Sequence, residues 1–211
     1  MASMAKIIQR IQRRVVLGKL SLIAVTIHLA LFGFGLTPAL ACEAQPLQVF
    51  LPLISGPVGP ENGDFEKGRV IWLESSTHAW KIILNSSELE IAPHGGSWAA
   101  WLGGVLNETS AIRQSTRVSR ANPYLSYWRW IASDETTCGS NLARVTVNAA
   151  VVEQYALCAG ANTHGWVNQV LDLSAYVGQT VSLQFTVSIG SARNSNLFID
   201  DIFFQSSASL E

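Results

Sequence analysis

Aromatic side chains recur at even spacing along one stretch of the chain, where they could stack on the apolar faces of sugar rings. Tyr124, Trp128 and Trp130 would share one face of an extended strand, because successive side chains of a strand point to opposite sides. Trp80 stands apart, near His78 in a loop-like stretch that favours exposure. We predict Trp80, Tyr124, Trp128 and Trp130 as ligand-binding residues. A buried aromatic stripe in a core would show the same spacing, so both interpretations of the stripe stay open.

The residue patterns of common hydrolase sites do not occur in this sequence. It contains no G-x-S-x-G and no H-E-x-x-H, and His78, His94 and His164 are scattered among turn-forming residues. Asp134 and Glu135 form a carboxylate pair, but adjacent side chains of an extended segment point apart. We therefore predict no catalytic residues and a chain that is not an enzyme.

The first 41 residues have the composition of an export signal. An apolar run without Lys, Arg, Asp or Glu, Leu20–Leu36, ends near small residues at Ala39 and Ala41. The run is short for crossing a bilayer, which takes about 20 residues, so cleavage and a retained membrane anchor are the two alternatives. Either one places the rest of the chain outside the cell, because the basic end stays in the cytoplasm. Five basic residues precede the run: Lys6, Arg10, Arg13, Arg14 and Lys19.

Three cysteines follow the signal-like segment. Export exposes them to oxidising conditions, so we predict a disulfide between Cys138 and Cys158. Cys42 is then the odd cysteine, at the position where a bacterial lipoprotein carries its lipid. The match to a lipoprotein signal is partial, because Ala39 stands where such signals usually have Leu. Lipidation of Cys42 is thus one route to a membrane tether.

Composition divides the remaining chain into a linker and one domain. Residues 42–60 contain four prolines and are typical of an extended spacer, and residues 61–206 have the length of one domain with a substantial core. From Cys42 onward, nine Lys or Arg stand against fifteen Asp or Glu, a net charge of −6. This acidic balance argues against a nucleic-acid partner.

Strand-like alternation dominates the predicted domain. In Val181–Ile189 every second residue is apolar, as in a strand with one buried face. Only Leu173–Tyr176 has the character of a short helical turn. The pattern predicts an all-β fold, a two-sheet antiparallel β-sandwich. Seven further strand candidates are separated by Gly, Asn and Ser clusters: Trp98–Leu102, Ile112–Val118, Tyr124–Ile131, Val145–Val147, Val151–Leu157, Val167–Leu171 and Leu197–Phe204.

Three passages of the domain are similar to a known group of modules. They are Asn62-Gly63-Asp64-Phe65-Glu66 followed by Trp72, then Trp166 with the segment 171–179, and finally Leu197–Ile202. Their order resembles the jelly-roll domains of the carbohydrate-binding-module and galactose-binding-like group. The resemblance implies a jelly-roll sandwich whose opening strand starts at Asn62. It is specific for the fold and weak for the ligand.

The same resemblance implies a structural calcium ion. Such modules often tie their first strand to their last through a cation, and Glu66 and Asp201 stand at the matching motif positions, with Asp64 and Asp200 beside them. Carboxylate oxygens suit Ca²⁺. The alternative is that Asp200 accepts backbone hydrogen bonds in a turn and Glu66 is merely exposed.

Two functions of different classes remain. The first is a non-catalytic binding module, exported or on the cell surface, that recognises a glycan. The second is a structural or adhesion component of the cell envelope, which contacts proteins and takes no small ligand. Both are compatible with a secreted or membrane-tethered β-sandwich, because this fold serves many roles.

Overall fold

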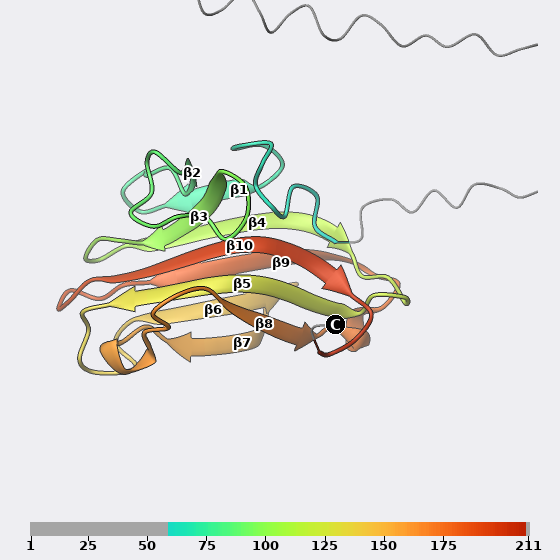
Figure 1. The fold of residues 1–211 in the computed structure, drawn as a ribbon. Helices are drawn as coiled ribbons and strands as arrows, with labels where there is room; N and C mark the ends of the chain where they lie inside the picture. The colour runs from blue at the N-terminus through green and yellow to red at the C-terminus, as the bar shows by residue number, and fades with distance from the viewer. Residues whose placement is uncertain (1–58, 210–211) are drawn as a thin grey trace, which may run out of the picture. The chain divides into compact units, whose positions relative to one another are not determined.

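Ten strands form the described part of the chain, residues 59–209 of a computed structural model (Figure 1). The predicted signal or anchor (1–41), nearly all of the predicted linker (42–60) and Cys42 lie outside the described residues. The strands are β1 (Leu73–Ser76), β2 (Ile83–Asn85), β3 (Trp98–Gly103), β4 (Thr109–Arg117), β5 (Tyr124–Ser133), β6 (Leu142–Val147), β7 (Ala150–Ala156), β8 (Val167–Asp172), β9 (Thr180–Ser188) and β10 (Ser195–Gln205).

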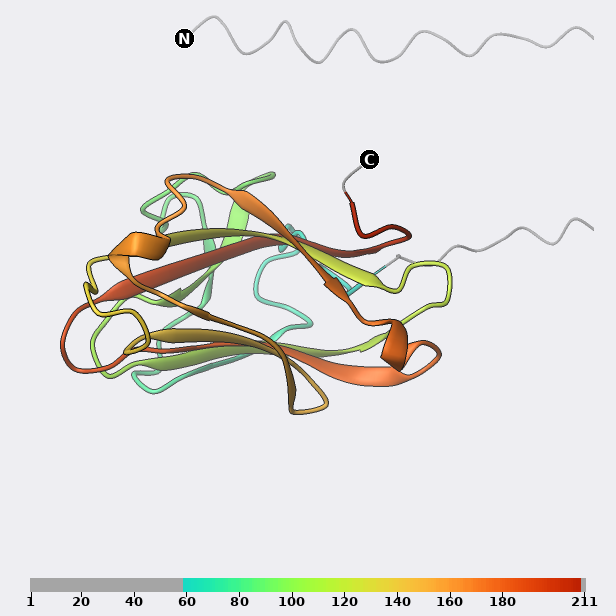
Figure 2. The same ribbon diagram turned by 90° about the horizontal axis from the view of Figure 1, so that it is seen from below.

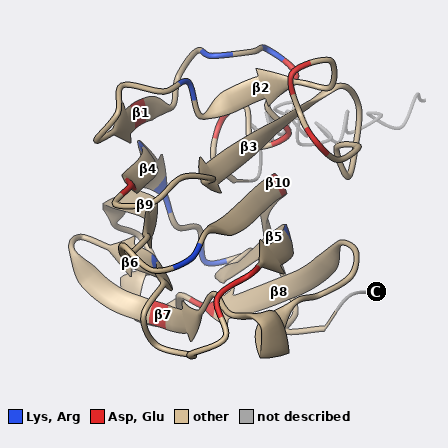
Figure 3. Cartoon of the chain, turned by 90° about the vertical axis from the view of Figure 1, so that its left-hand side faces the viewer, with Lys and Arg blue, Asp and Glu red and all other residues tan. Residues whose placement is uncertain are grey.

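The strands pair into two antiparallel sheets of five, which confirms the predicted β-sandwich. One sheet has the order β1-β4-β9-β6-β7 and the other β2-β3-β10-β5-β8. Figure 3 shows the two sheets as two columns of strands, and Figure 2 shows the two layers from another side. Neighbouring strands of a sheet are mostly far apart in sequence, so the chain crosses repeatedly from one layer to the other.

Alternating apolar residues of both sheets meet in a shared core. In β9, Val181, Leu183, Phe185 and Val187 are buried while the residues between them are partly exposed, as the period-two pattern predicts. Across the core, the ring of Tyr127 on β5 packs edge-on against Phe185, with centroids 5.0 Å apart. Each buried side chain of this size contributes about 1.5–3 kcal/mol to folding.

All eight strands predicted from the alternating residue pattern are present, and two short strands are additional. β1 and β2 have four and three residues. Neither is long enough to show a period, which is why the sequence pattern does not reveal them. Both are edge strands of their sheets, and they flank the loop that carries Trp80. The predicted short turn is also present, as the 3-10 helix η3 (Ser174–Tyr176), and a second 3-10 helix, η2 (Ala159–Ala161), is additional.

The predicted opening strand is wrong: the segment from Asn62 to Trp72 folds as a series of turns. Asn62 and Phe65 have positive φ angles of 55° and 56°, which are incompatible with an extended strand. The side chain of Asn62 donates to the carbonyl of Gly68 at 3.0 Å, and the Trp72 indole donates to the carbonyl of Asn62 at 2.9 Å. These bonds close the segment into a compact loop, and Phe65 is fully buried in the core.

The opening segment nevertheless lies beside the last strand, as the resemblance implies. The amide of Ile202 on β10 donates to the carbonyl of Gly63 at 2.9 Å. A Cβ at Gly63 would stand 1.9 Å from the carbonyl oxygen of Ile202, so only glycine allows this approach. The pairing of β10 with β5 shifts register between Asp200 and Phe203, and Asp201 has a φ of 47° at this bulge.

Cys138 and Cys158 form the predicted disulfide, with their Cα atoms 5.1 Å apart. The bridge closes a loop of 20 residues that contains β6 and β7. Within residues 59–209, no helix is long and apolar enough to cross a membrane.

Candidate functional site

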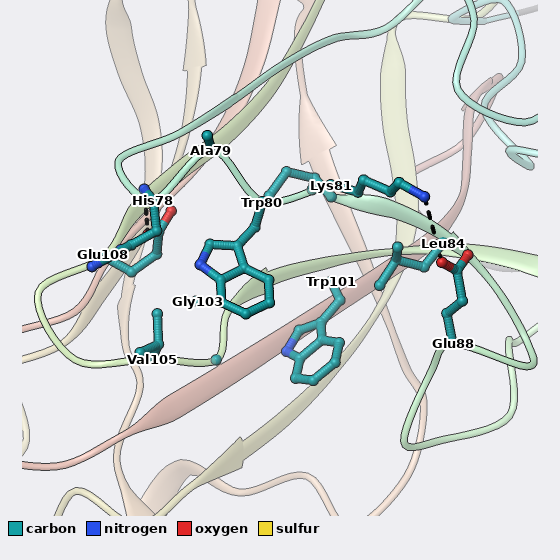
Figure 4. A pocket seen from close by; sticks show the side chains of 12 residues that line it. His78, Ala79, Trp80, Lys81, Leu84, Glu88, Trp101, Gly103, Val105 and Glu108 are labelled. Atoms are coloured by element: carbon teal, nitrogen blue, oxygen red, sulfur yellow. Dashed lines mark hydrogen bonds and ion pairs between the residues drawn. The ribbon is translucent and has the colours of Figure 1, made fainter.

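An open cleft of about 750 Å³ lies over the edge of the second sheet, beside β2 and β3 (Figure 4). Two tryptophans, Trp80 and Trp101, line its middle between the other labelled residues. Its wall is formed by β2, β3 and three loops, which join β1 to β2, β2 to β3 and β3 to β4. The other lining residues are His78, Ala79, Lys81, Ile82, Leu84, Glu88, Gly103, Gly104, Val105 and Glu108.

Trp101 forms a fixed base for the cleft. It comes from β3, where its side chain points away from the core, and its ring stacks on Phe198 of β10 with centroids 5.4 Å apart. Its indole N–H donates to Oδ1 of Asn196 at 3.0 Å. Gly104 lies against the ring. A Cβ at this position would stand 3.2 Å from the indole, so glycine avoids a steric clash with Trp101. Trp101 is therefore positioned before any ligand arrives.

Trp80 is the exposed partner of Trp101. Its exposed fraction is 63 %, which confirms the expectation that Trp80 lies in a loop and is exposed. Hydrogen bonds from its backbone amides hold the loop in place. The Trp80 amide donates to Oγ of Ser76 at 3.1 Å, and Ala79 makes the turn with a φ of 58°. Further along, the Ile82 amide donates to Oε2 of Glu74 at 2.6 Å. A large apolar ring is thus held in water by a well-bonded loop.

Polar groups stand at both ends of the aromatic pair (Figure 4). At one end, Nδ1 of His78 lies 2.5 Å from Oε2 of Glu108, whose side chain is only 1 % exposed. Burial alone would raise the pKa of Glu108, but contacts with Ser76 and His78 outweigh it and hold the pKa below its usual value. At the other end, Lys81 forms an exposed ion pair with Glu88 at 3.7 Å.

The predicted stripe of Tyr124, Trp128 and Trp130 is not part of this cleft. It lies on β5, on the face that points away from the core, since the core face carries Leu125 and Tyr127. The stripe is therefore not the buried core alternative either. All three aromatic residues are partly exposed.

Other side chains pack against two rings of the stripe, Trp128 and Trp130. The imidazole of His94 stacks on Trp128, with centroids 3.9 Å apart and planes at 17°. Trp166 packs edge-on against Trp130 at 6.1 Å, and its indole N–H donates to the carbonyl of Ala92. A ligand could reach the Trp128 face only by displacing His94.

The candidate calcium residues Glu66 and Asp201 both lie against the turn Gly95–Gly96. A Cβ on Gly96 would lie 2.3 Å from Cδ of Glu66, and a Cβ on Gly95 would lie 2.9 Å from Oδ2 of Asp201. Oε1 of Glu66 accepts from the amides of Ser97 and Trp98, at 2.7 and 2.9 Å. The two carboxylates thus share one glycine cradle that side chains would fill.

Asp64 and Asp200 have other tasks in this part of the structure. Asp64 accepts from the amide of Glu66 at 3.4 Å. Asp200 is fully buried and accepts from the amides of His94, Gly95 and Asp201, at 2.9, 3.1 and 2.8 Å. Burial first, and the nearby Asp201 charge, raise the pKa of Asp200 to about 7 despite these hydrogen bonds. Asp200 therefore anchors the turn to β10, as the alternative interpretation expects.

The fit of these residues to a cation is incomplete from side chains alone. Among residues 59–209, no three His, Cys, Asp or Glu side chains are grouped closely enough to hold a metal ion. Oδ2 of Asp201 already lies 2.6 Å from Nδ1 of His94. Within the same part of the chain, one oxygen each of Glu66 and Asp201 has no hydrogen-bond donor, so backbone carbonyls would have to complete a calcium site.

Sequence reasoning missed Trp101 and the polar ends of the cleft. The one signal for Trp101 is the pair Gly103-Gly104 after it, because a bulky ring needs small neighbours. Glu108 and Lys81 come from separate loops, and nothing in their spacing links them to Trp80.

The structure is thus a two-sheet β-sandwich with an aromatic cleft at the edge of one sheet. No protein-family model matches the chain, and no curated protein matches its sequence. Solved structures do. One is the carbohydrate-binding module TmCBM61, solved with β-1,4-galactotriose, which is 15 % identical in sequence. The alignment covers 72 % of this chain and 100 % of TmCBM61, with a TM-score of 0.50.

A second similar structure is an adhesin domain. The K3 cleaved adhesin domain of Lys-gingipain from Porphyromonas gingivalis W83 is 12 % identical, covers 69 % of this chain over 97 % of its own, and has a TM-score of 0.51. The chain therefore has the sandwich fold shared by carbohydrate-binding and adhesin modules. At these identities the likeness is one of fold.

Proposed function

We propose that this chain is a non-catalytic binding module that recognises a glycan through the cleft of Trp80 and Trp101. The observation that carries the proposal is an exposed tryptophan held beside a second, immobilised tryptophan in an open cleft with polar ends. Pyranose rings present apolar C–H faces that stack on indoles, while their hydroxyls need hydrogen-bond partners around the ring. Both requirements are met by the residues of the cleft.

The rigidity of the cleft supports binding without large rearrangement. Trp101 is fixed by Phe198 and Asn196, and the Trp80 loop is fixed by Ser76 and Glu74. A preorganised site loses less conformational entropy when a ligand binds. A similar fold in a carbohydrate-binding module agrees with this function, although fold alone does not assign a ligand.

The proposed place of action is outside the cell, in the medium or on the envelope. It rests on the signal-like residues 1–41 and on the Cys138–Cys158 disulfide, which fits an oxidising compartment. A retained apolar segment Leu20–Leu36 or a lipid on Cys42 would tether the domain to the membrane. The acidic balance of the exported part leaves nucleic acid an unsuitable partner.

Adhesion through protein contacts is the second candidate, and one surface favours it. Val70, Ile71 and Leu73 are 49, 40 and 62 % exposed, and Leu73 belongs to the edge strand β1. Ile71 has a φ of 76°, an unusual angle for a β-branched residue. Exposed apolar side chains beside an unpaired strand edge suit a protein partner.

We also propose a structural Ca²⁺ held by Glu66 and Asp201 and completed by backbone carbonyls, because the predicted helpers Asp64 and Asp200 already accept backbone hydrogen bonds. Its support is the shared glycine cradle at Gly95–Gly96, which joins the opening loop to β10. A cation there would offset the repulsion between carboxylates that converge from two distant segments. The ion would stabilise the sandwich and take no part in recognition.

A glycan array with the purified protein tests the main proposal. We expect a defined set of glycans to bind the wild type, and Trp80→Ala to abolish their signals. Leu73→Ala is the matched control, because Leu73 is as exposed as Trp80 but lies outside the cleft. An array without any signal would contradict glycan recognition. A pull-down of envelope proteins that the wild type gives and the Leu73→Ala variant loses would instead favour adhesion.

A further inference from the structure

The polar side chains at the two ends of the cleft indicate which class of sugar it would bind. Nδ1 of His78 lies 2.5 Å from Oε2 of Glu108, and the His78 backbone amide approaches the same oxygen at 3.3 Å. The ring of His78 is 41 % exposed at the end of the aromatic pair, whereas Glu108 is 1 % exposed beneath it. The buried carboxylate therefore holds an exposed imidazole at the cleft.

We propose that His78, fixed by Glu108, accepts a hydrogen bond from a ligand hydroxyl and restricts the cleft to glycans without acidic groups. The inference rests on the proposed function and names the class of sugar for the same site. The chemistry follows from the tautomer. An ionised carboxylate can only accept, so Nδ1 of His78 carries a proton, and in this Nδ1–H tautomer Nε2 has a lone pair for a donor.

Glu108 is suited to fixing that tautomer. Its backbone is anchored, because the amide of Ile189 donates to the Glu108 carbonyl at 2.7 Å. The lowered pKa of Glu108 keeps the carboxylate ionised at neutral pH. The pairing thus leaves Nε2 as the free polar atom of the His78 ring. A sugar hydroxyl is the complementary donor.

The charges of the cleft exclude acidic sugars. Four charged or titratable side chains line it: His78 and Glu108 at one end, and Lys81 and Glu88 at the other. Lys81 is already paired with Glu88, so Glu108 is the carboxylate of the cleft lining that has no Lys or Arg partner there. Within residues 59–209, Oε1 of Glu108 is buried without a hydrogen-bond partner, so that carboxylate is incompletely neutralised. A uronic acid would bring a second negative charge against it.

The test compares neutral trisaccharides with their acidic derivatives. The probes are β-1,4-galactotriose and cellotriose, each alongside the same trisaccharide oxidised at C6, and the readout is Kd by calorimetry. We expect at least one neutral trisaccharide to bind, and its oxidised form to bind about tenfold or more weakly. His78→Phe should weaken the neutral probe about tenfold, whereas His78→Gln, which keeps an acceptor, should retain most of the affinity.

The controls separate this inference from the proposed function. His164→Ala removes an exposed histidine outside the cleft and should leave every Kd unchanged. Nitrogen NMR of the His78 ring should show the proton on Nδ1 in wild type without any ligand. Equal affinity for oxidised probes, unchanged binding by His78→Phe, or a proton on Nε2 would each overturn the inference and leave Trp80-dependent glycan binding standing. Array signals from acidic glycans alone would also overturn it. An array without signals would overturn both proposals.

Discussion

The imidazole of His94 lies flat on the indole of Trp128, with ring centroids 3.9 Å apart and an angle of 17° between the planes. The same imidazole contacts Asp201 through Nδ1 at 2.6 Å, so the stack is held from the side by β10. One face of Trp128 is therefore occupied by the protein itself. In the cleft, by contrast, Trp80 and Trp101 both line an open space.

Removing the covering imidazole tests this distinction. His94→Ala should uncover Trp128 and lower the free energy of unfolding by about 1 kcal/mol, because the stack on Trp128 and the hydrogen bond to Asp201 are lost. Acrylamide quenching of tryptophan fluorescence should increase. Glycan binding through the cleft should stay unchanged, and tighter glycan binding by this variant would place recognition on the uncovered stripe instead.

The disulfide should make a measurable contribution to stability. Replacing Cys138 and Cys158 together by Ala frees a loop of 20 residues in the unfolded chain. The chain-entropy model gives a loss of about 3 kcal/mol in the free energy of unfolding. Urea unfolding of the double variant and the wild type measures the difference. A midpoint that matches the oxidised wild type would show that the bridge contributes nothing.

The fold could be predicted because its main strands have a regular pattern. Val181–Ile189 alternates at nearly every position, and β9 is the central strand of its sheet. The prediction was wrong at Asn62–Trp72, where positive φ angles and side-chain hydrogen bonds from Asn62 produce turns. Local hydrogen bonding there replaces strand pairing, and residue pattern alone does not reveal it.

The candidate site could be predicted only where the local sequence around one residue indicates its exposure. Trp80 stands in a loop with polar neighbours, which suffices to expect exposure. Trp101 depends on Phe198, a residue 97 positions away that comes into contact only through the pairing of β3 with β10. Likewise, His94 covers Trp128 because a distant loop folds back over β5. Such contacts depend on the topology of the fold and produce no recognisable residue spacing in the sequence.

Calcium removal tests the proposed ion. If Ca²⁺ binds the native state alone, it adds about 2.7 kcal/mol at a hundredfold excess over Kd. EDTA should therefore lower the melting temperature, and added Ca²⁺ should restore it. Glu66→Gln and Asp201→Asn should each remove the response. A melting temperature that EDTA does not change, together with the absence of calcium in elemental analysis, would rule the site out.

Acid should weaken the protein partly through Glu108. Its pKa in the folded protein is lower than its usual value of 4.5, so its stabilising contribution is present above about pH 4.5 and is lost as the pH falls through the folded pKa. Glu108→Gln should cost about 1–3 kcal/mol at pH 7 and flatten the acid side of the stability profile. Urea unfolding between pH 3 and pH 7 measures both effects.

Glu88→Gln is the matched control for that experiment. Glu88 also contributes a carboxylate to the cleft, but its side chain is 46 % exposed and pairs only with exposed Lys81. An exposed pair of this kind contributes at most about 1 kcal/mol. Equal effects of the two substitutions would mean that burial of Glu108 has no energetic consequence.

The most direct test of the central claim is the Kd of the best array glycan for four proteins: wild type, Trp80→Ala, Trp101→Ala and Leu73→Ala. Loss of a stacking ring should weaken binding by about tenfold or more in either tryptophan variant. Trp80→Ala should keep the wild-type melting temperature, because its ring is 63 % exposed. Leu73→Ala should bind as the wild type does. An unchanged Kd in Trp80→Ala, with the fold intact, would contradict recognition through this cleft.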